Sequence, residues 1–261
     1  SNQLRPQSIA STITGAEDNP HVDLLALSNH FASDLLDALP PAFDRMDDAL
    51  FDLANNARNN NEQNRYFEAM RELRLKRRGI EQKFSDELTA RFNPKHVERK
   101  DEKKELDSAT LALVNDARLE EDLAISTMAN KARANMESVL LTLNRRVSVI
   151  YGVNEDKLNS PLSPTAVSES FANASSQLDI ELSERLLLLK QFDKLVMPNI
   201  QAILADINES LANSGILREL SDSEVRRSTK QTFNPSAVRS PQTPPSAQTS
   251  NTSIHTQEEV L

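Results

Sequence analysis

The sequence predicts an all-α fold: an irregular bundle of about six to seven helices that includes one long spine helix. Apolar residues recur at steps of three and four through most of residues 19–220, and this spacing places them on one face of a helix. The 261 residues include only four glycines, two tyrosines and no tryptophan, whereas an all-β fold needs turn glycines and aromatic strands. Residues 1–18 are polar and residues 221–261 are rich in serine, threonine, proline and glutamine, so both ends are expected to be disordered.

The first helix can be placed from its prolines. Asn19 followed by proline is typical of an N-cap with proline at the first helical position, so the helical domain is expected to span 19–220. Pro40 and Pro41 should end or kink this helix. Its apolar stripe consists of Leu24, Leu27, Phe31, Leu35 and Leu39.

Two more amphipathic helices are expected in residues 42–92, separated by a cluster of asparagines. Short amide side chains hydrogen-bond nearby backbone groups and favour caps and turns. Asn59 with Glu62, or Asn60 with Gln63, resembles a capping box, so a helix should restart near residue 61. The apolar stripe of this helix consists of Phe67, Met70, Leu73, Ile80, Phe84, Leu88 and Phe92.

A basic run lies within that helix and forms the candidate basic patch. Arg77 occupies the gap in the apolar stripe, where its stem can pack while its guanidinium needs a partner. The preceding helix has an acidic face, which supplies the nearest carboxylates in sequence. The candidate basic patch consists of Arg71, Arg74, Lys76, Arg77 and Arg78, and the candidate ion-pair partners are Asp47, Asp48 and Asp52.

Two interpretations of this patch remain open. The first is an interhelical ion pair surrounded by solvated arginines. The second is a surface that binds a phosphate-bearing ligand, a nucleic acid or an acidic partner. Arg74 and Arg78 have the Arg-x-x-x-Arg spacing of PilZ-type cyclic-dinucleotide receptors, but the sequence lacks the Asp/Asn-x-Ser-x-x-Gly motif and the strands that such a site also needs.

A charged connector is expected at 93–106, because Asn93–Pro94 stops the preceding helix and charges of both signs follow. The helical domain would then have two sub-parts, 19–92 and 107–220. Asn115 should cap a continuous spine helix that runs to Gly152 and measures roughly 50 Å. The apolar stripe of the spine consists of Ala129, Ala132, Met136, Val139, Leu143, Val147 and Ile150.

Three more helices are expected between residues 163 and 216. Ser163–Pro164 should open the first and Asp179 should cap the second. Leucines cover so much of the second helix that it should be central in the bundle. Met197–Pro198 should kink or break the chain before the third helix. Gly215–Ile216 is typical of a Schellman end, with Ile216 packing on Leu211.

Five stretches of the sequence carry a resemblance to a known family. They are Asp47-Asp48-Ala-Leu-Phe-Asp-Leu-Ala, Asn61-Glu-Gln-Asn, the run from Phe67 to Glu81, Leu119-Glu-Glu-Asp-Leu-Ala-Ile-Ser-Thr-Met128 and Asn159-Ser-Pro-Leu-Ser-Pro164. Across residues 22–217 the chain resembles the bacterial domain-of-unknown-function family 1631. The resemblance implies a long, cytoplasmic protein. It also implies that longer members are similar to cyclic-dinucleotide signalling proteins through a PilZ-like C-terminal domain.

Composition narrows the possible functions. A net charge of −9 and a pI near 5.1 disfavour binding to bulk nucleic acid or to an anionic membrane. The sequence has no cysteine, which excludes disulfides and thiolate metal sites and fits a reducing, cytoplasmic compartment. It also shows no signal peptide, membrane span, glycine-rich phosphate loop or Glu-x-x-His pattern. We therefore expect no catalytic residues, no metal site and no cofactor.

The leading hypothesis is a non-enzymatic interaction or regulatory region of a bacterial cytoplasmic protein. The family resemblance implies that this protein serves cyclic-dinucleotide signalling, with the ligand domain downstream of residue 261. The expected partner is another protein or a downstream domain of the same chain, and the wide apolar faces could also pair two copies. One alternative is binding of nucleic acid or a phosphate ligand through residues 71–78, although we do not expect nucleic acid given the charge. The second alternative is an enzyme of unrecognised type.

Overall fold

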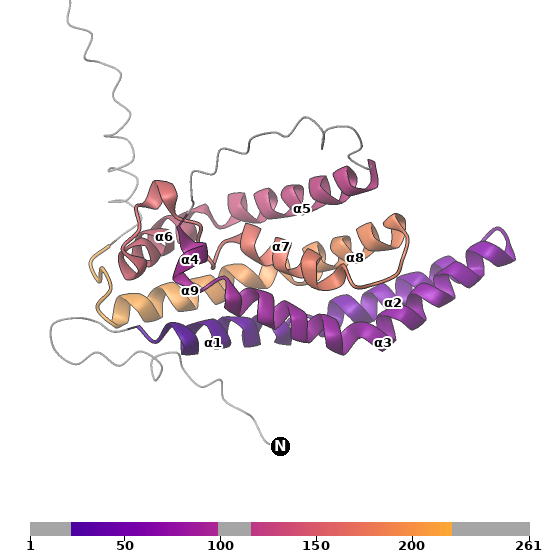
Figure 1. Ribbon diagram of the computed structural model, residues 1–261, viewed down its shortest axis with the longest axis horizontal. Helices are drawn as coiled ribbons and strands as arrows, with labels where there is room; N and C mark the ends of the chain where they lie inside the picture. The colour runs from indigo at the N-terminus through magenta and orange to yellow at the C-terminus, as the bar shows by residue number, and fades with distance from the viewer. Residues whose placement is uncertain (1–21, 99–115, 221–261) are drawn as a thin grey trace, which may run out of the picture.

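The computed structural model describes residues 22–98 and 116–220, and these form the helical bundle in Figure 1. The helices are α1 (Leu24–Asp37), α2 (Pro40–Asn55), α3 (Asn60–Ala90), α4 (Pro94–Val97), α5 (Asp116–Asn135), α6 (Glu137–Tyr151), α7 (Pro164–Ser175), α8 (Leu182–Leu195) and α9 (Met197–Asn213), with a 3₁₀ turn at Glu155–Lys157. Apart from one antiparallel bridge between Glu98 and Leu158, the described residues pair no strands. The predicted all-α fold is confirmed. The expected disorder of both ends, the Asn19 and Asn115 caps and most of the charged connector lie outside the described residues.

Polar caps set where several helices begin. The carboxylate of Asp23 accepts hydrogen bonds from the backbone N–H groups of Leu25 and Ala26, at 3.1 and 3.0 Å, and so starts α1. At α3 the side chain of Asn59 accepts from the N–H of Glu62 at 2.9 Å, as the capping box predicts. The return bond reaches one residue further back than in the standard box, because Glu62 Oε2 accepts from the N–H of Arg58. Ser163 caps α7 as expected, through the N–H of Ala166.

The helix expected to run unbroken to Gly152 is two helices. The chain turns at Met136, whose φ of −121° and ψ of 25° are not helical, and α6 starts at the next residue. The two halves pack on different neighbours: α5 lies against α7 and α8, whereas α6 lies against α9. One straight rod could not bury both apolar faces, which accounts for the break. Among the described helices the longest is instead α3, with 31 residues.

For α8 and α9, the predictions made from proline and glycine are correct, whereas the predicted cap at Asp179 is wrong. α8 begins at Leu182 with no side-chain cap, so Asp179 was wrongly assigned as its cap. The break predicted at Met197–Pro198 separates α8 from α9. Gly215 has a φ of +95°, and the N–H of Ile216 donates to the carbonyl of Leu211 at 3.1 Å. The predicted Schellman end of α9 is therefore confirmed.

A single hydrophobic core joins the parts of the chain before and after the connector. Phe171 of α7 stacks on Phe192 of α8 with ring centroids 3.9 Å apart. Phe84 of α3 meets both rings edge-on, at 5.7 and 5.9 Å. All three rings are fully buried, and α3 also packs on α1 and α2. The stability of the first part therefore depends on side chains of the second.

The start of the predicted connector is exposed at most of its described positions, as expected, but Val97 anchors it to the second part of the chain. Val97 is 0% exposed, and its carbonyl accepts a 2.7 Å hydrogen bond from the N–H of Asn159. The side chain of Asn159 donates to the carbonyl of His96 at 2.9 Å. The carbonyl of Phe92, four residues before His96, accepts a hydrogen bond from the hydroxyl of Tyr151 at 2.8 Å. These bonds attach residues 92–97 to the second part of the chain, which the charge pattern alone did not predict. Among the described helices, none is both long and apolar enough to cross a membrane.

Candidate functional site

The candidate basic patch lies along α3, and three of its five side chains are ion-paired. Arg74 makes a bidentate pair with Asp47, at 2.7 and 2.6 Å. Arg77 donates to Asp44 at 2.9 Å and to Glu81 at 3.2 Å, and its guanidinium lies 5.1 Å from the ring centroid of Phe43. Arg74 and Arg77 therefore hold α2 against α3.

Lys76 is the third paired member of the patch. It pairs with Glu72 and donates to the carbonyl of Gln177 at 2.6 Å, which ties α3 to the loop before α8. Hydrogen bonds from Lys76 and from the N–H of Asp179 lower the pKa of Glu72. Arg71 and Arg78 differ, because both are exposed and neither has a partner in the described part of the chain.

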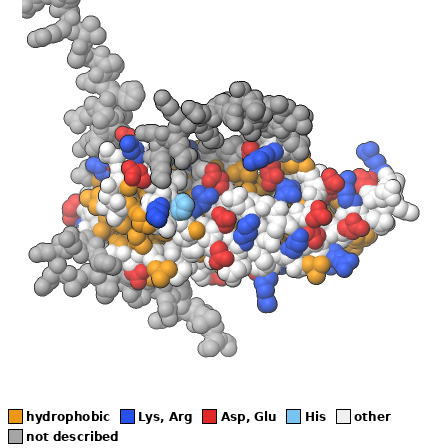
Figure 2. Space-filling view, viewed as in Figure 1, with side chains coloured by type: hydrophobic (Ala, Val, Ile, Leu, Met, Phe, Trp, Pro, Cys, Tyr) orange, Lys and Arg blue, Asp and Glu red, His pale blue; other side chains and the backbone are white. Residues whose placement is uncertain are grey.

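The carboxylate partners of Arg77 are not those expected from sequence. It pairs with Asp44 and Glu81 rather than with Asp47, Asp48 or Asp52, and 34% of its side chain is exposed. Because α2 and α3 run antiparallel, each residue further along α2 faces an earlier residue of α3, and this register gives Asp47 to Arg74. Asp48 lies 3.9 Å from Arg45, and the carboxylate of Asp52 has no ion pair within the described residues. The distance between residues along the sequence does not reveal which residue of α2 faces which residue of α3, so the partners of Arg77 could not be predicted. Figure 2 shows the outcome at the hairpin end, where basic and acidic side chains are interspersed.

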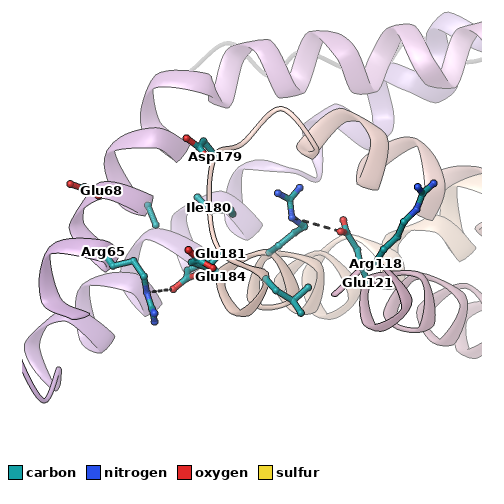
Figure 3. A pocket seen from close by; sticks show the side chains of 11 residues that line it. Arg65, Glu68, Arg118, Glu121, Asp179, Ile180, Glu181 and Glu184 are labelled. Atoms are coloured by element: carbon teal, nitrogen blue, oxygen red, sulfur yellow. Dashed lines mark ion pairs between the residues drawn. The ribbon is translucent and has the colours of Figure 1, made fainter. Parts of the chain in front are cut away.

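A charged pocket of about 690 Å³ lies where α3, α5, α8 and the loop before α8 meet (Figure 3). Its lining contains more carboxylates than guanidiniums, together with a short apolar wall. The carboxylates belong to Glu68, Glu121, Asp179, Glu181 and Glu184, the guanidiniums to Arg65, Arg118 and Arg185, and the apolar side chains to Ala69, Ile180 and Leu182.

Glu184 is the most unusual residue of this pocket, because its side chain carries a carboxylate and is only 1% exposed. Oε1 lies 3.1 Å from Nε of Arg65, which is within ion-pair distance, but no donor in the described part of the chain is aligned to form a hydrogen bond with it. Oε2 accepts from the hydroxyl of Ser183 at 3.1 Å. Burial of a carboxylate is costly unless it is paired, so the ion pair with Arg65 is what makes this buried glutamate tolerable.

A second ion pair crosses the pocket between α5 and α8. Nε of Arg185 lies 3.7 Å from Glu121, and Nη2 of Arg185 donates to the carbonyl of Leu178 at 3.2 Å. Burial raises the pKa of Glu121, and the charge of Arg185 offsets part of that rise. The carboxylates of Glu68 and Asp179 have no ion pair or hydrogen bond to another described residue. The pocket thus has acidic groups that the fold itself does not use.

An apolar groove of about 460 Å³ lies between α5 and α8, the helices that also contribute to the charged pocket. Its floor includes Ala124, Met128, Leu186 and Leu189, and its rim carries a 2.9 Å ion pair between Lys131 and Asp193. Leu123 lines the groove and is 65% exposed, and Leu119, one turn earlier, is 59% exposed. We call Leu119, Leu123 and the groove the α5–α8 face. Exposed apolar side chains beside a groove are a common feature of protein–protein interaction surfaces.

Sequence reasoning identified neither the buried glutamate nor the α5–α8 face. It expected α8 to be central because leucines surround it, yet Leu186 and Leu187 are only half-buried. Glu184 precedes Leu188 by four residues and so belongs to the buried stripe of α8. The sequence signal that could have identified Glu184 is an acidic residue at one of the buried positions of this helix.

The comparisons with known proteins give one match. Residues 20–215 match a family model described as "Protein of unknown function (DUF1631) N-terminal domain". This confirms the family resemblance of the sequence. No curated protein and no solved structure matches the chain.

Proposed function

We propose, from the premise that this chain belongs to the DUF1631 family, that its helical bundle is a non-enzymatic region that binds another protein or another domain of its own chain. The observation that carries the proposal is the α5–α8 face. Covering a leucine side chain stabilises a complex by about 1.5–3 kcal/mol. Two leucines four residues apart beside an apolar groove are the kind of anchor that a partner helix uses.

The regulatory part of the proposal does not rest on the α5–α8 face. A link to cyclic-dinucleotide signalling and a cytoplasmic location both come from the family resemblance. The basic patch adds little to them, because the charges of Arg74, Lys76 and Arg77 are already neutralised by carboxylates. We therefore propose that any cyclic dinucleotide acts through another domain, and that the bundle transmits the signal through its partner.

Site-specific crosslinking tests the interaction proposal. A photoreactive amino acid replaces Leu123 in the protein expressed in its native cells. A matched sample carries it at Leu75, which is 70% exposed but lies on α3 away from the groove. The proposal predicts a discrete crosslinked partner from position 123 that is absent from position 75. Equal patterns from the two positions would contradict it.

A second candidate function is binding of nucleic acid or of a phosphate ligand, favoured by Arg71 and Arg78, which have no partner among the described residues. Two guanidiniums form a small footprint on a chain of net charge −9. Fluorescence polarisation with labelled oligonucleotides at two salt concentrations tests this candidate. Affinity that falls steeply with salt and is lost in Arg71→Gln/Arg78→Gln would favour it. Absence of binding at low salt would remove it.

A further inference from the structure

We infer that the partner of the α5–α8 face is a second copy of this chain, packed antiparallel across a two-fold axis. This inference rests on the proposed function, because it names the occupant of the surface on which that proposal depends. The observation that favours a second copy is the distribution of charge along the face, which is complementary to itself in the antiparallel direction.

The apolar part of the face is uncovered in the described structure. Leu119 and Leu123 lie one turn apart on α5 and are 59% and 65% exposed. α5 lies at one edge of the described bundle, where it packs on α7 and α8 (Figure 1). The floor of the groove beside the two leucines consists of Ala124, Met128, Leu186 and Leu189. A second copy would cover these leucines with an apolar surface of the same kind and have its own covered in return.

The charge of α5 changes sign along the helix. Residues 116–125 contain four acidic residues and one arginine, whereas residues 126–135 contain two basic residues and no acidic one. An antiparallel copy sets the acidic half of one helix against the basic half of the other, while a parallel copy would set like charges together. A two-fold axis generates both favourable contacts at once, because each residue of an isologous interface is used twice.

Glu120 and Lys190 are the charged groups available to fix the register. Both line the groove and are exposed, and neither side chain has an ion pair or a hydrogen bond with another described residue. Two ion pairs between α5 and α8 show that these helices run in the same direction: Glu121–Arg185 and Lys131–Asp193. Interpolation between the pairs places Lys190 about two turns, or roughly 10 Å, further along the groove than Glu120.

A two-fold axis close to Leu123 would satisfy both groups. It places Glu120 of each copy beside Lys190 of the other, so that two ion pairs form across the interface. The same axis sets Leu119 of each copy over Met128 of the other, on the floor of the groove, and brings the two Leu123 side chains together. The charged and the apolar contacts therefore agree on one register.

Sedimentation equilibrium of the 261-residue chain, with matched variants, tests the inference. The unmodified chain of 29.1 kDa should form a dimer. Leu119→Asp/Leu123→Asp should sediment as a monomer, because a dimer would bury unpaired carboxylates in the interface. The control is Leu75→Asp, which adds a charge at a leucine that is 70% exposed on α3 and should leave the dissociation constant unchanged. Circular dichroism melts verify that each variant is folded.

Charge reversal tests the register. Glu120→Lys and Lys190→Glu should each weaken the dimer roughly tenfold, since each variant sets two pairs of like charges against one another. An equimolar mixture of the two variants should recover the affinity of the unmodified chain, because every contact between them joins a lysine to a glutamate. Recovery on mixing requires contact between copies and is not expected from a change within one chain.

Three results would overturn the inference: an unmodified chain that stays monomeric, a dimer that survives the leucine variant, or a mixture as weak as the single variants. The proposed function is tested separately, by the crosslink from position 123. A crosslink to a different protein, together with a monomeric chain, would overturn the second copy and leave the proposed function standing. Equal crosslinking patterns from positions 123 and 75 would contradict the proposed function itself.

Discussion

The α2–α3 hairpin and the side of the bundle formed by α5 and α8 use their charged residues differently. On the hairpin, Arg74 and Arg77 are neutralised by carboxylates across the interface or one turn away. At the charged pocket, Glu68 and Asp179 have no ion pair within the described residues. The difference teaches that the densest run of charge in a sequence need not be its binding site, because pairing in the fold decides which charges remain available.

Both regions pack on the same hydrophobic core. The substitution with the largest expected loss of stability tests whether that core is shared. Phe171→Ala removes a fully buried ring that contacts Phe84 before the connector and Phe192 after it. We expect a loss of about 3–5 kcal/mol in the free energy of unfolding and a single cooperative transition. Chemical denaturation followed by circular dichroism measures both. Two separate transitions, with only the second destabilised, would show that the sub-parts fold independently.

A smaller loss is expected where a charge is used only for structure. Arg146 of α6 is buried and donates to the carbonyls of Ile216 and Leu217 and to the side chain of Asn208. Arg146→Met keeps much of the stem but leaves buried carbonyls without donors, so we expect a cost of about 1–3 kcal/mol. Thermal melts against Arg145→Met, an exposed neighbour in the same helix, provide the control. Equal melting temperatures for the two variants would contradict a structural role for Arg146.

Tyr151 offers a test that depends on pH. Burial raises its pKa to about 12, while an unfolded tyrosine has a pKa near 10. The neutral hydroxyl is favoured in the folded state, so its contribution is fully present below pH 10 and is lost as pH rises from 10 toward 12. Tyr151→Phe should cost about 1 kcal/mol at pH 7, through the hydrogen bond to Phe92.

The pH dependence separates this hydrogen bond from simple packing. The advantage of the unmodified protein over Tyr151→Phe should shrink above pH 10 and then reverse, because only the tyrosine must stay protonated to remain in the fold. Urea denaturation at pH 7, 9, 10 and 11 measures the difference between the two proteins. A difference that is constant over this range would contradict burial of the hydroxyl.

An effect as small as that of Tyr151→Phe is expected on the hairpin. Arg77 would be worth about 3–5 kcal/mol if it were a fully buried partner, but a third of its side chain is exposed. Its ion pairs and its contact with the ring of Phe43 together should contribute about 1 kcal/mol. Arg77→Ala should therefore lower stability slightly, and Arg77→Met less, since methionine keeps the apolar packing. A loss above 3 kcal/mol for Arg77→Ala would mean that the hairpin charges are buried more deeply than the structure shows.

The features that the sequence predicted correctly are those that depend on a few neighbouring residues. Asn59, Ser163 and the Gly215 turn were identified because caps and C-terminal turns depend on a few neighbouring residues. The break at Met136 was missed because it depends on which helices α5 and α6 pack against. The same reason explains the wrong partners of Arg77. Asp47, Asp48 and Asp52 were expected, but the register of α2 on α3 is a tertiary property and places Asp44 beside Arg77. Glu184 and the exposed leucines of α5 likewise became evident only once α3, α5 and α8 were assembled.

The most direct test of the central claim compares the two surfaces in one experiment. The protein is affinity-purified from its native cells and its retained partners are quantified by mass spectrometry. Leu119→Asp/Leu123→Asp alters the α5–α8 face, and Arg71→Gln/Arg78→Gln removes the exposed charges of the hairpin. The account predicts that the leucine variant loses a specific partner that the arginine variant retains. Loss of that partner with the arginine variant and retention with the leucine variant would contradict it.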